Sequence, residues 1–409
     1  MKFLYNTFIF LYHQMIRLAA FFYPKARLWR DGRKNNFSNI EKKISGTQKI
    51  IWVHCASLGE FEQGRPLIEA LKKKFSEHKI LLTFFSPSGY EIRKKYSGAD
   101  FIFYLPMDSS ANAKRFISTI KPVAAFFVKY EFWFNYLSEL KKNKIPTYLV
   151  SGIFRKNHYF LKSYSSWFRK QLSVFTFFFL QDELSEKLLN SIGYTNTIIS
   201  GDTRFDRVLE ISKNAPENNL VVLFKADKKI ILAGSTWEED EKIIFETPFS
   251  EANFKLIIAP HEVNESRIQS IISRFEKNNF LRLSQANEKN IKSANILLID
   301  NVGMLSSLYQ YAEIAYIGGG FGKGIHNILE AATFGMPIIF GPNYRKFKEA
   351  IDLINKGVAF PIDSSEVFEK LFFELSKNDI RRKEISRNSI VYIQENSGAT
   401  KRIIEHISL

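Results

Sequence analysis

Residues 49–75 read KIIWVHCASLGEFEQGRPLIEALKKKF. The first six residues, Lys49 to His54, form an apolar run of strand length. Residues 55–66 form a turn, and residues 66–75 have the apolar spacing of a helix. A strand, a turn and a helix in this order are the repeating unit of α/β folds. Because the unit recurs along the chain, we expect parallel sheets covered by helices on both faces.

Two series of such units follow one another. The first continues with expected strands at Lys79–Phe85, Phe101–Leu105, Val123–Val128, Thr147–Val150 and Phe175–Leu180. The second has expected strands at Lys229–Ala233, Phe254–Ala259, Asn295–Asp300, Glu313–Ile317 and Pro337–Phe340, with polar helical segments from Ser364 onward. The segment Asn214–Asn219 has the composition of a linker. A chain of 409 residues also exceeds the size of one hydrophobic core.

The sequence therefore predicts an α/β protein with two Rossmann-like domains facing each other across a cleft, where the carboxyl ends of the strands would bind ligands. We expect an N-terminal segment over residues 1–35, a first domain over 36–205 and a second domain over 206–409.

The composition indicates a globular chain with an acidic partner. Hydrophobic residues make up 45% of the chain, enough for two cores. Lys and Arg number 58 against 42 Asp and Glu, a formal charge of +16, so nucleic acid, anionic lipid and a phosphorylated substrate all qualify as partners. The single cysteine, Cys55, excludes an intramolecular disulfide and is typical of a reducing compartment.

The first 23 residues are crowded with aromatic and aliphatic side chains. The uncharged stretch before Arg17 is shorter than the roughly 20 residues of a spanning helix, and no small-residue cleavage site follows it. Basic residues that could contact anionic headgroups come next: Lys25, Arg27, Arg30, Arg33 and Lys34. We expect a helix that lies on the membrane surface. The alternatives are a helix packed on the protein's own core and a single tilted span.

Two carboxylates follow neighbouring expected strands. Glu60 lies in the turn after the first strand, where a carboxylate could accept a proton from an attacking hydroxyl. Glu131 lies just past the strand that ends at Val128. Each has a structural alternative, since Glu60 could favour a helix N-terminus and Glu131 could pair with Lys129 or cap the next helix.

A glycine-rich loop, Gly318 to Glu330, is the strongest local signal for a nucleotide. Its backbone amides, Gly319 and Gly320 among them, could approach a phosphate, and a helix that opens near Asn327 would point its positive end at the same place. The loop fits neither the dinucleotide fingerprint nor the Walker loop. Glu330 could accept from ribose hydroxyls, or it could merely favour the helix dipole.

Three further observations concern the same edge. Gly234 and Ser235 form a small turn after the first strand of the second series, and Arg204 could neutralise a departing phosphate. The seven histidines are scattered without paired ligand spacing, and the aspartates are not paired for a magnesium ion. We therefore expect no required metal and no cofactor.

With these positions in hand, the sequence resembles the 3-deoxy-D-manno-octulosonic acid (Kdo) transferases of Gram-negative lipopolysaccharide biosynthesis. The resemblance covers nearly the whole chain and rests on several motifs in order: Ser57-Leu58-Gly59-Glu60, Ser86-Pro87-Ser88-Gly89, Tyr104 to Asp108, Glu131-Phe132-Trp133, Gly201 to Asp206, and Gly318 to Glu330.

The resemblance implies a GT-B fold, CMP-Kdo as donor and a lipid A precursor (lipid IVA), a phosphorylated and acylated glucosamine disaccharide, as acceptor. It implies that Glu60 is the proton acceptor, that inversion occurs at the anomeric carbon, and that Glu131 and Arg204 stabilise the transition state. It also implies contact with anionic lipids at the cytoplasmic face of the inner membrane. The positions it implies for CMP binding are Pro260, His261, Val302, Gly303, Met304, Asn327, Ile328, Leu329 and Glu330.

Three departures from the family pattern bear on these roles. Arg204 replaces a lysine, which keeps the charge and changes the geometry. His261 stands where an arginine is more common, and Met304 stands where an acidic residue is expected. Two rival hypotheses remain: another nucleotide-sugar enzyme of the same fold, such as a UDP-sugar transferase or epimerase, and a nucleic-acid-binding protein. No recognisable RNA- or DNA-binding motif supports the latter, so we expect no nucleic-acid partner.

Overall fold

The computed structural model describes residues 1–44, 46, 48–162, 165–275 and 279–409. The chain forms two compact units. Unit 1 consists of Met1–Arg207 together with Ser397–Leu409, and unit 2 consists of Val208–Asn396. The division between them falls inside helix α10 (Thr203–Lys213) and not in the linker-like segment that follows it.

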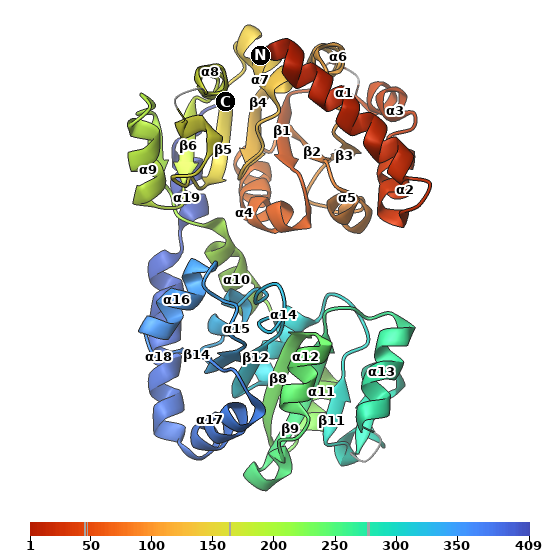
Figure 1. Cartoon of the computed structure of the whole chain (residues 1–409), viewed down its shortest axis with the longest axis vertical. Coiled ribbons are helices and arrows are strands. Elements are labelled where there is room, and N and C mark those ends of the chain that lie inside the picture. Colours follow the sequence, from red (N-terminus) through yellow and green to blue (C-terminus); the bar gives the residue numbers. More distant parts are fainter. Residues whose placement is uncertain (45, 47, 163–164, 276–278) are drawn as a thin grey trace. The chain divides into compact units, whose positions relative to one another are not determined.

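Unit 1 is built on a seven-stranded sheet in the order β3-β2-β1-β4-β5-β6-β7, in which every pair of neighbours is parallel (Figure 1). The strands are β1 (Ile50–Cys55), β2 (Lys79–Phe84), β3 (Phe101–Tyr104), β4 (Pro122–Val128), β5 (Thr147–Gly152), β6 (Phe177–Leu180) and β7 (Thr197–Ile199). This confirms the parallel α/β architecture expected for the first half of the chain.

Alternate side chains of the strands supply two separate cores, one on each face of this sheet. Trp52 and Phe127 belong to the core that is covered by the following helices: α3 (Asn36–Lys43), α6 (Ser110–Ile120), α7 (Phe134–Lys142), α8 (Ser166–Leu172) and α9 (Glu183–Asn190). Val53 and Phe126 belong to the core of the opposite face, which α4 (Leu58–Lys74) and α19 (Ala399–Glu405) help to cover. Strands buried on both faces explain the unbroken apolar runs of the sequence.

Unit 2 repeats the architecture with a second seven-stranded parallel sheet, in the order β10-β11-β9-β8-β12-β13-β14. Its strands are β8 (Lys229–Thr236), β9 (Phe254–Pro260), β10 (Phe280–Arg282), β11 (Ile296–Leu298), β12 (Ile314–Ile317), β13 (Ile338–Phe340) and β14 (Ala359–Pro361). Its helices are α11 (Asn219–Lys225), α12 (Glu238–Ile244), α13 (Glu265–Phe275), α14 (Leu305–Leu308), α15 (Leu329–Ala332), α16 (Lys348–Asn355), α17 (Ser365–Lys377) and α18 (Asp379–Asn396).

Helix α4 begins earlier than the sequence suggested. The turn expected over residues 55–66 is short, because α4 starts at Leu58 and continues through Pro66. Proline inside a helix removes one hydrogen bond at a cost of about 3 kcal/mol. Phe61, Leu67 and Leu71 on the same helix are fully buried against the sheet, and this packing outweighs the loss.

The N-terminal segment forms α1 (Lys2–Ala19) and α2 (Pro24–Asp31), which belong to unit 1 (red in Figure 1). The Tyr5 hydroxyl donates a 2.5 Å hydrogen bond to buried Asp108, and Asn135 donates to Asn6, so α1 is attached to the unit. At the same time Phe3, Phe8 and other large apolar side chains stay more than half exposed. Within the described residues, no helix combines the length and hydropathy needed to cross a bilayer.

The C-terminal residues return to unit 1. Ile403 and Ile407 are buried in the core next to α4, and Lys74 of α4 donates to the carbonyls of Ile404 and Ile407. At the other end of α19, the carboxylate of Asp206 accepts from the backbone amides of Gly398 and Thr400. The helix therefore completes one face of the first sheet.

Candidate functional site

In unit 1 the candidate base Glu60 lies at the carboxyl edge of the sheet, in the first turn of α4. The Ser57 hydroxyl donates to the Glu60 carboxylate, which fixes the side chain next to the end of β1. A carboxylate in a first turn is also stabilised by the helix dipole. Glu60 therefore lies at a helix N-terminus, as the structural alternative expected. Its side chain is half-buried, so a substrate hydroxyl could still reach it.

Glu131 follows β4, the strand next to β1, and its side chain is 13% exposed. The indole Nε1–H of Trp133 lies 2.6 Å from Glu131 Oε2, and His54 Nε2 lies 3.3 Å from the same oxygen. Burial raises the pKa of the Cys55 thiol well above its usual range, and the charges of Glu60 and Glu131 raise it further. Both carboxylates thus act on one small region at the end of β1.

A buried chain of hydrogen bonds lies behind Glu131. The Trp52 indole donates to Thr83 Oγ1 over 2.8 Å, and Thr83 Oγ1 lies 2.8 Å from His54 Nδ1. Because Trp52 is a donor only, the Thr83 hydroxyl can give its own hydrogen to Nδ1. His54 Nε2 lies 3.3 Å from Glu131 Oε2 and 3.1 Å from the indole Nε1 of Trp133, so the three side chains meet at one point. Trp52, Thr83 and His54 are all fully buried, so the carboxylate is held by groups that water does not reach.

Three non-glycine residues adopt a left-handed backbone at the carboxyl ends of central strands. They are Lys129 (φ 65°) after β4, Ser151 (φ 52°) in β5 and Ser235 (φ 56°) in β8. Such conformations each cost about 1–3 kcal/mol and cluster at functional sites. Lys129 and Ser235 lie at strand ends where the sequence placed candidate residues, whereas the end of β5 at Ser151 carried none.

Arg204 is held by a buried aspartate. Its Nε and one terminal nitrogen lie 2.8 and 2.7 Å from Asp202 Oδ2, and Gln63 of α4 donates to the other oxygen, Oδ1, at 3.0 Å. Burial acts to raise the pKa of Asp202, but the Arg204 charge and these hydrogen bonds outweigh it, so the pKa lies below its ordinary value. Asp202 is therefore ionised, and the pair ties Arg204 to the helix that carries Glu60.

In unit 2 the expected donor-binding residues follow four neighbouring parallel strands, β11, β9, β8 and β12. Gly234 and Ser235 end β8, Pro260 ends β9 with His261 after it, residues 302–304 follow β11, and Gly319 and Gly320 follow β12. The carboxyl ends of parallel strands lie at one edge of a sheet, so the structure brings these loops to a common edge.

The glycine-rich loop is organised by the protein itself. The amide of Gly319 donates to the buried carboxylate of Asp240, and the amide of Gly318 donates to the Gly234 carbonyl. A Cβ on Gly320 would lie 2.5 Å from the Gly341 backbone nitrogen. Close backbone packing thus accounts for the glycines, and a role of the Gly319 amide in phosphate binding stays a prediction.

The helix after this loop is shorter and starts later than expected. It was expected near Asn327, but α15 comprises only Leu329–Ala332. The side chains of Ile328 and Leu329 are buried, so only their backbone is available to a ligand. Asn327 donates from its side chain to Glu330 Oε1 at 2.9 Å, and this pair remains at the surface.

His261 belongs to a stack of rings. Its ring centroid lies 4.2 Å from that of His326 and 4.8 Å from that of Trp237, and the Trp237 indole donates to His326 Nε2 at 3.0 Å. Burial and the neighbouring His261 lower the pKa of His326 to about 4, so its ring is neutral at pH 7. The stack joins the end of β8, the end of β9 and the glycine-rich loop.

The loop after β11 is the most open part of this edge. Val302 is 80% exposed, Gly303 has φ +98°, and Met304 precedes α14.

Sequence reasoning missed several residues of these networks. They are Trp52, Thr83, His54, Trp133, Trp237, Asp240 and His326. Their polar atoms lie within apolar runs or behind the loops, and only the fold shows what they bind. In the described part of the chain, no group of three or more His, Cys, Asp or Glu side chains could hold a metal ion.

Comparison with known proteins identifies the relatives of this chain. The family model described as 3-deoxy-D-manno-octulosonic-acid transferase (kdotransferase) matches residues 31–207. The 3-deoxy-D-manno-octulosonic acid transferase of Aquifex aeolicus is 29% identical, with 85% of this chain and 92% of the relative covered. The enzyme of the same name from Haemophilus influenzae is 26% identical, with 87% and 86% covered.

Solved structures of similar fold include the UDP-GlcNAc 2-epimerase from Neisseria meningitidis bound to UDP-GlcNAc. It is 18% identical, with a TM-score of 0.61 and coverage of 88% of this chain and 99% of that one. A glycosyltransferase from Rickettsia africae is 13% identical, with a TM-score of 0.56 and coverage of 88% and 97%. At these identities the likeness concerns the fold alone, which is α/β of the GT-B type.

Two parallel seven-stranded sheets, the family match to residues 31–207 and relatives aligned over most of the chain agree with one another. Residues 31–207 of this chain match the Kdo transferase family model, and the chain is similar over most of its length to curated Kdo transferases, which are glycosyltransferases.

Proposed function

We propose that this protein transfers Kdo from CMP-Kdo to a lipid A precursor, lipid IVA, in lipopolysaccharide biosynthesis. The observation that carries the proposal is the pair of carboxylates, Glu60 and Glu131, at the ends of neighbouring strands inside the part of the chain that the family model matches. Unit 1 supplies the base and binds the acceptor, and unit 2 binds the donor.

In the proposed step the Glu60 carboxylate accepts the proton of an acceptor hydroxyl as that oxygen attacks the anomeric carbon of Kdo. The new C–O bond forms while the bond from the anomeric carbon to the CMP phosphate oxygen breaks. CMP leaves with the electron pair. Attack opposite the leaving group inverts the configuration at the anomeric carbon.

Glu131 and Arg204 assist this step in the proposal. A carboxylate fixed by His54 and Trp133 can stabilise positive charge that develops on the sugar without having to reorient. Arg204 offsets the negative charge on the departing phosphate and shares its guanidinium with Asp202. A base and a fixed cation can do this chemistry without a metal ion, so we propose a metal-independent reaction whose rate persists in EDTA.

For the donor we propose the edge of unit 2 that carries the ring stack and the loops of residues 302–304 and 327–330. Because the Gly319 amide donates to Asp240, we expect other groups of this edge to bind the donor phosphate. His261 contacts the glycine-rich loop through its stacking on His326.

For the acceptor we propose a lipid presented at the cytoplasmic face of the inner membrane, contacted by the exposed apolar side chains of α1. Burial of several such side chains in a bilayer, together with the basic residues that follow them, is the usual means by which a surface helix binds anionic membranes.

The test is to incubate detergent-solubilised protein with a CMP-Kdo generating system and tetraacylated lipid A precursor, and to measure the mass gain of Kdo. Glu60→Gln keeps the size of the side chain and removes the base, so its rate should fall by about 10² to 10⁴. Glu69→Gln on the same helix is the matched control, because Glu69 lies beyond the first turn, where it pairs with Arg65. If Glu60→Gln transfers Kdo at the wild-type rate, Glu60 is not the base. If the protein transfers sugar from a UDP-sugar and none from CMP-Kdo, the proposed donor is wrong.

A further inference from the structure

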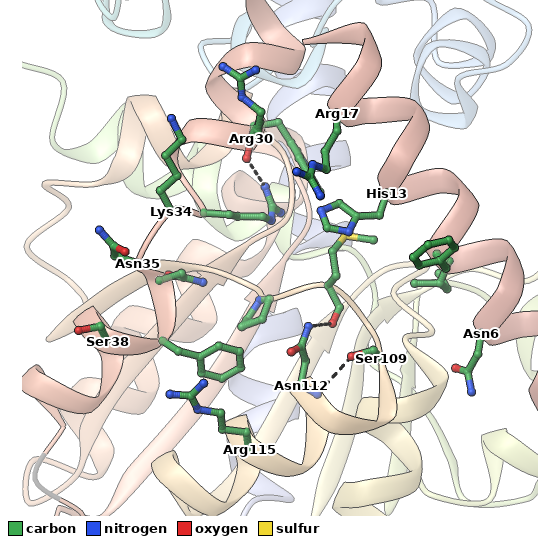
Figure 2. A pocket seen from close by; sticks show the side chains of 18 residues that line it. Asn6, His13, Arg17, Arg30, Lys34, Asn35, Ser38, Ser109, Asn112 and Arg115 are labelled. Atoms are coloured by element: carbon green, nitrogen blue, oxygen red, sulfur yellow. Dashed lines mark hydrogen bonds between the residues drawn. The ribbon is translucent and has the colours of Figure 1, made fainter.

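A cavity of about 770 Å³ lies in unit 1 beneath the N-terminal helix. Its walls come from α1, from α2 and the residues after it, from α3, and from α6 and the loop that leads into it. Figure 2 shows Asn6, His13 and Arg17 along one side of α1, and Arg30, Lys34 and Arg115 on the other elements around the same space. None of these residues has a role in the proposed transfer.

Helix α1 presents three distinct stripes, each with helical spacing. One stripe packs on unit 1: Tyr5, Ile9, Tyr12 and Ile16. The next stripe lines the cavity: Asn6, Phe10, His13 and Arg17. The third stripe is between 53% and 66% exposed: Leu4, Phe8, Leu11, Met15 and Leu18. Phe10 lines the cavity and is also 59% exposed, so the mouth of the cavity is continuous with the apolar surface of the helix.

The cavity carries an excess of positive charge. Five cations line it, and no Asp or Glu does: Arg17, Arg30, Arg33, Lys34 and Arg115. Three carboxylates lie just outside: Asp31 is paired with Arg30 and Lys34, Glu41 is paired with Arg115, and buried Asp108 accepts from Tyr5. Five cations against three carboxylates leave an excess of two positive charges around one cavity, which favours an anionic ligand.

Arg33 is a half-buried cation at the base of this group. It donates to the carbonyl oxygens of Trp29, Phe85 and Leu105, and its guanidinium lies 3.8 Å from the centre of the Trp29 ring. Burial lowers the pKa of Arg33 to about 9, so it still carries its charge at neutral pH. Carbonyl oxygens and ring faces stabilise this charge without cancelling it, and in a partly desolvated place its field on an anion is stronger than in water.

The size of the cavity and its neutral polar side chains limit the kinds of ligand that fit it. A volume of about 770 Å³ falls in the range of sites for whole small molecules and is far larger than one phosphate requires. Hydroxyl and amide side chains alternate with the cations around it, as suits a polyhydroxylated group: Asn6, Asn35, Ser38, Ser109 and Asn112. The chemistry is that of a phosphorylated sugar.

Packed rings connect this cavity to the candidate catalytic residues. Trp29, which lines the cavity, packs at 5.8 Å from Phe85, and Phe85 packs at 4.7 Å from Trp133. Trp133 donates to Glu131. The cavity therefore lies two ring contacts and one hydrogen bond from a proposed catalytic carboxylate, within the same unit.

We propose that this cavity binds a phosphorylated end of the acceptor's saccharide headgroup, while the acyl chains lie along the exposed stripe of α1. This inference rests on the proposed function for the identity of the saccharide. Arg17 and Arg115 bind the phosphate from opposite walls, and Arg33 supplies the half-buried charge beneath it.

The first test is binding, which does not require catalysis. Neutral phosphatidylcholine vesicles are prepared with lipid A precursor, with its dephosphorylated form, or with phosphatidylglycerol at equal charge, and binding is measured by flotation. Wild-type protein should bind the phosphorylated precursor at least about tenfold more tightly than the dephosphorylated form, as two charge-assisted contacts imply. Arg17→Gln/Arg115→Gln should abolish that difference. Lys73→Gln/Lys187→Gln, which removes two exposed charges from α4 and α9, is the matched control and should keep it.

The second test is a parallel transfer assay, which separates the two proposals. With the phosphorylated acceptor, the double arginine variant should show about a tenfold higher KM and an unchanged KM for CMP-Kdo, and removal of the phosphates should raise the KM of that variant no further. If wild type transfers Kdo and the double arginine variant still prefers the phosphorylated acceptor, the proposed cavity site is wrong and the proposed function is supported. A lost preference without any Kdo transfer would leave the cavity standing and overturn the function. If wild-type protein binds phosphatidylglycerol vesicles as tightly as vesicles with the phosphorylated precursor, the proposed recognition of the saccharide is wrong.

Discussion

His54→Phe is the substitution that probes the network behind Glu131. His54 is fully buried, and the substitution keeps an aromatic ring of similar size between Phe127 and Trp133. It removes His54 Nε2, which lies 3.3 Å from Glu131 Oε2, and His54 Nδ1, which lies 2.8 Å from Thr83 Oγ1. The variant therefore changes how one carboxylate is held while the apolar packing around it is kept.

The structure sets the size of two separate effects. A hydrogen bond to a charged group contributes about 1.5–3 kcal/mol, so the loss of the His54 contact with Glu131 should lower kcat by about tenfold to a hundredfold. A buried hydroxyl without a partner costs about 1–3 kcal/mol of folding free energy. Thr83→Val is the complementary variant, because it keeps His54 and removes the hydroxyl itself. It leaves the Trp52 N–H without its acceptor, Thr83 Oγ1.

The assay compares kcat and both KM values for wild type, His54→Phe and His54→Gln, with unfolding in urea followed for each. Glutamine can present an amide N–H near the position of Nε2 and should recover part of the loss in kcat. In a Glu131→Ala background, His54→Phe should lower kcat no further, because the two residues act as one unit. A folded His54→Phe variant with kcat within twofold of wild type would refute the reasoning.

Three further predictions concern stability and membrane contact. Burial raises the pKa of Asp108 to about 6, and the hydrogen bond from Tyr5 opposes this rise. Because the carboxyl pKa is higher in the folded than in the unfolded chain, this group favours folding more as pH falls through 6. Tyr5→Phe should therefore lower the urea midpoint by more at pH 8 than at pH 5, and an equal loss at both would contradict it. Gly320→Ala places a Cβ 2.5 Å from backbone and should lower the thermal midpoint, whereas Gly322→Ala, with its nearest atom at 3.7 Å, should leave it unchanged. Met15→Gln should weaken binding to anionic vesicles by about tenfold without a change in thermal midpoint, since the side chain is 66% exposed.

Long, fully buried strands were visible in the sequence, and short edge strands were not. Eleven strands were expected, and each has a counterpart in the structure with shifted ends. The three missed strands, β7, β10 and β14, have three residues each and lie at the edges of their sheets. A strand of three residues with one neighbour buries little surface, so its apolar pattern is too short to stand out.

The candidate site was predictable to the extent that it depends on strand ends. Glu60 and Glu131 follow β1 and β4, and these strands are neighbours in the sheet, as expected. The network behind Glu131 was not predictable. Thr83, which contacts His54, lies inside β2 and meets it only through the parallel register of β1 and β2. Whether these residues catalyse the reaction stays a prediction.

The N-terminal segment was expected as a membrane anchor, with packing on the protein's own core as an alternative. Tyr5 and Ile9 pack on unit 1, whereas Phe8 and Met15 on the same helix are exposed. A sequence that is apolar on more than one face does not tell which stripe the protein itself covers. Membrane contact remains a prediction that the exposed stripe supports.

The return of α19 to unit 1 has a consequence for biosynthesis. Unit 2 is continuous in the chain, so a ribosome has synthesised all of it before Ile403 and Ile407 are made. The face of the first sheet that carries α4 lacks α19 during that time, which at about 5–20 residues per second lasts some 10–40 seconds. The half of the protein that is synthesised first is therefore the half that finishes folding last, and Glu60, on α4, is among its late-settling parts. A released chain that is truncated before residue 399 should expose α4 to protease while unit 2 is resistant.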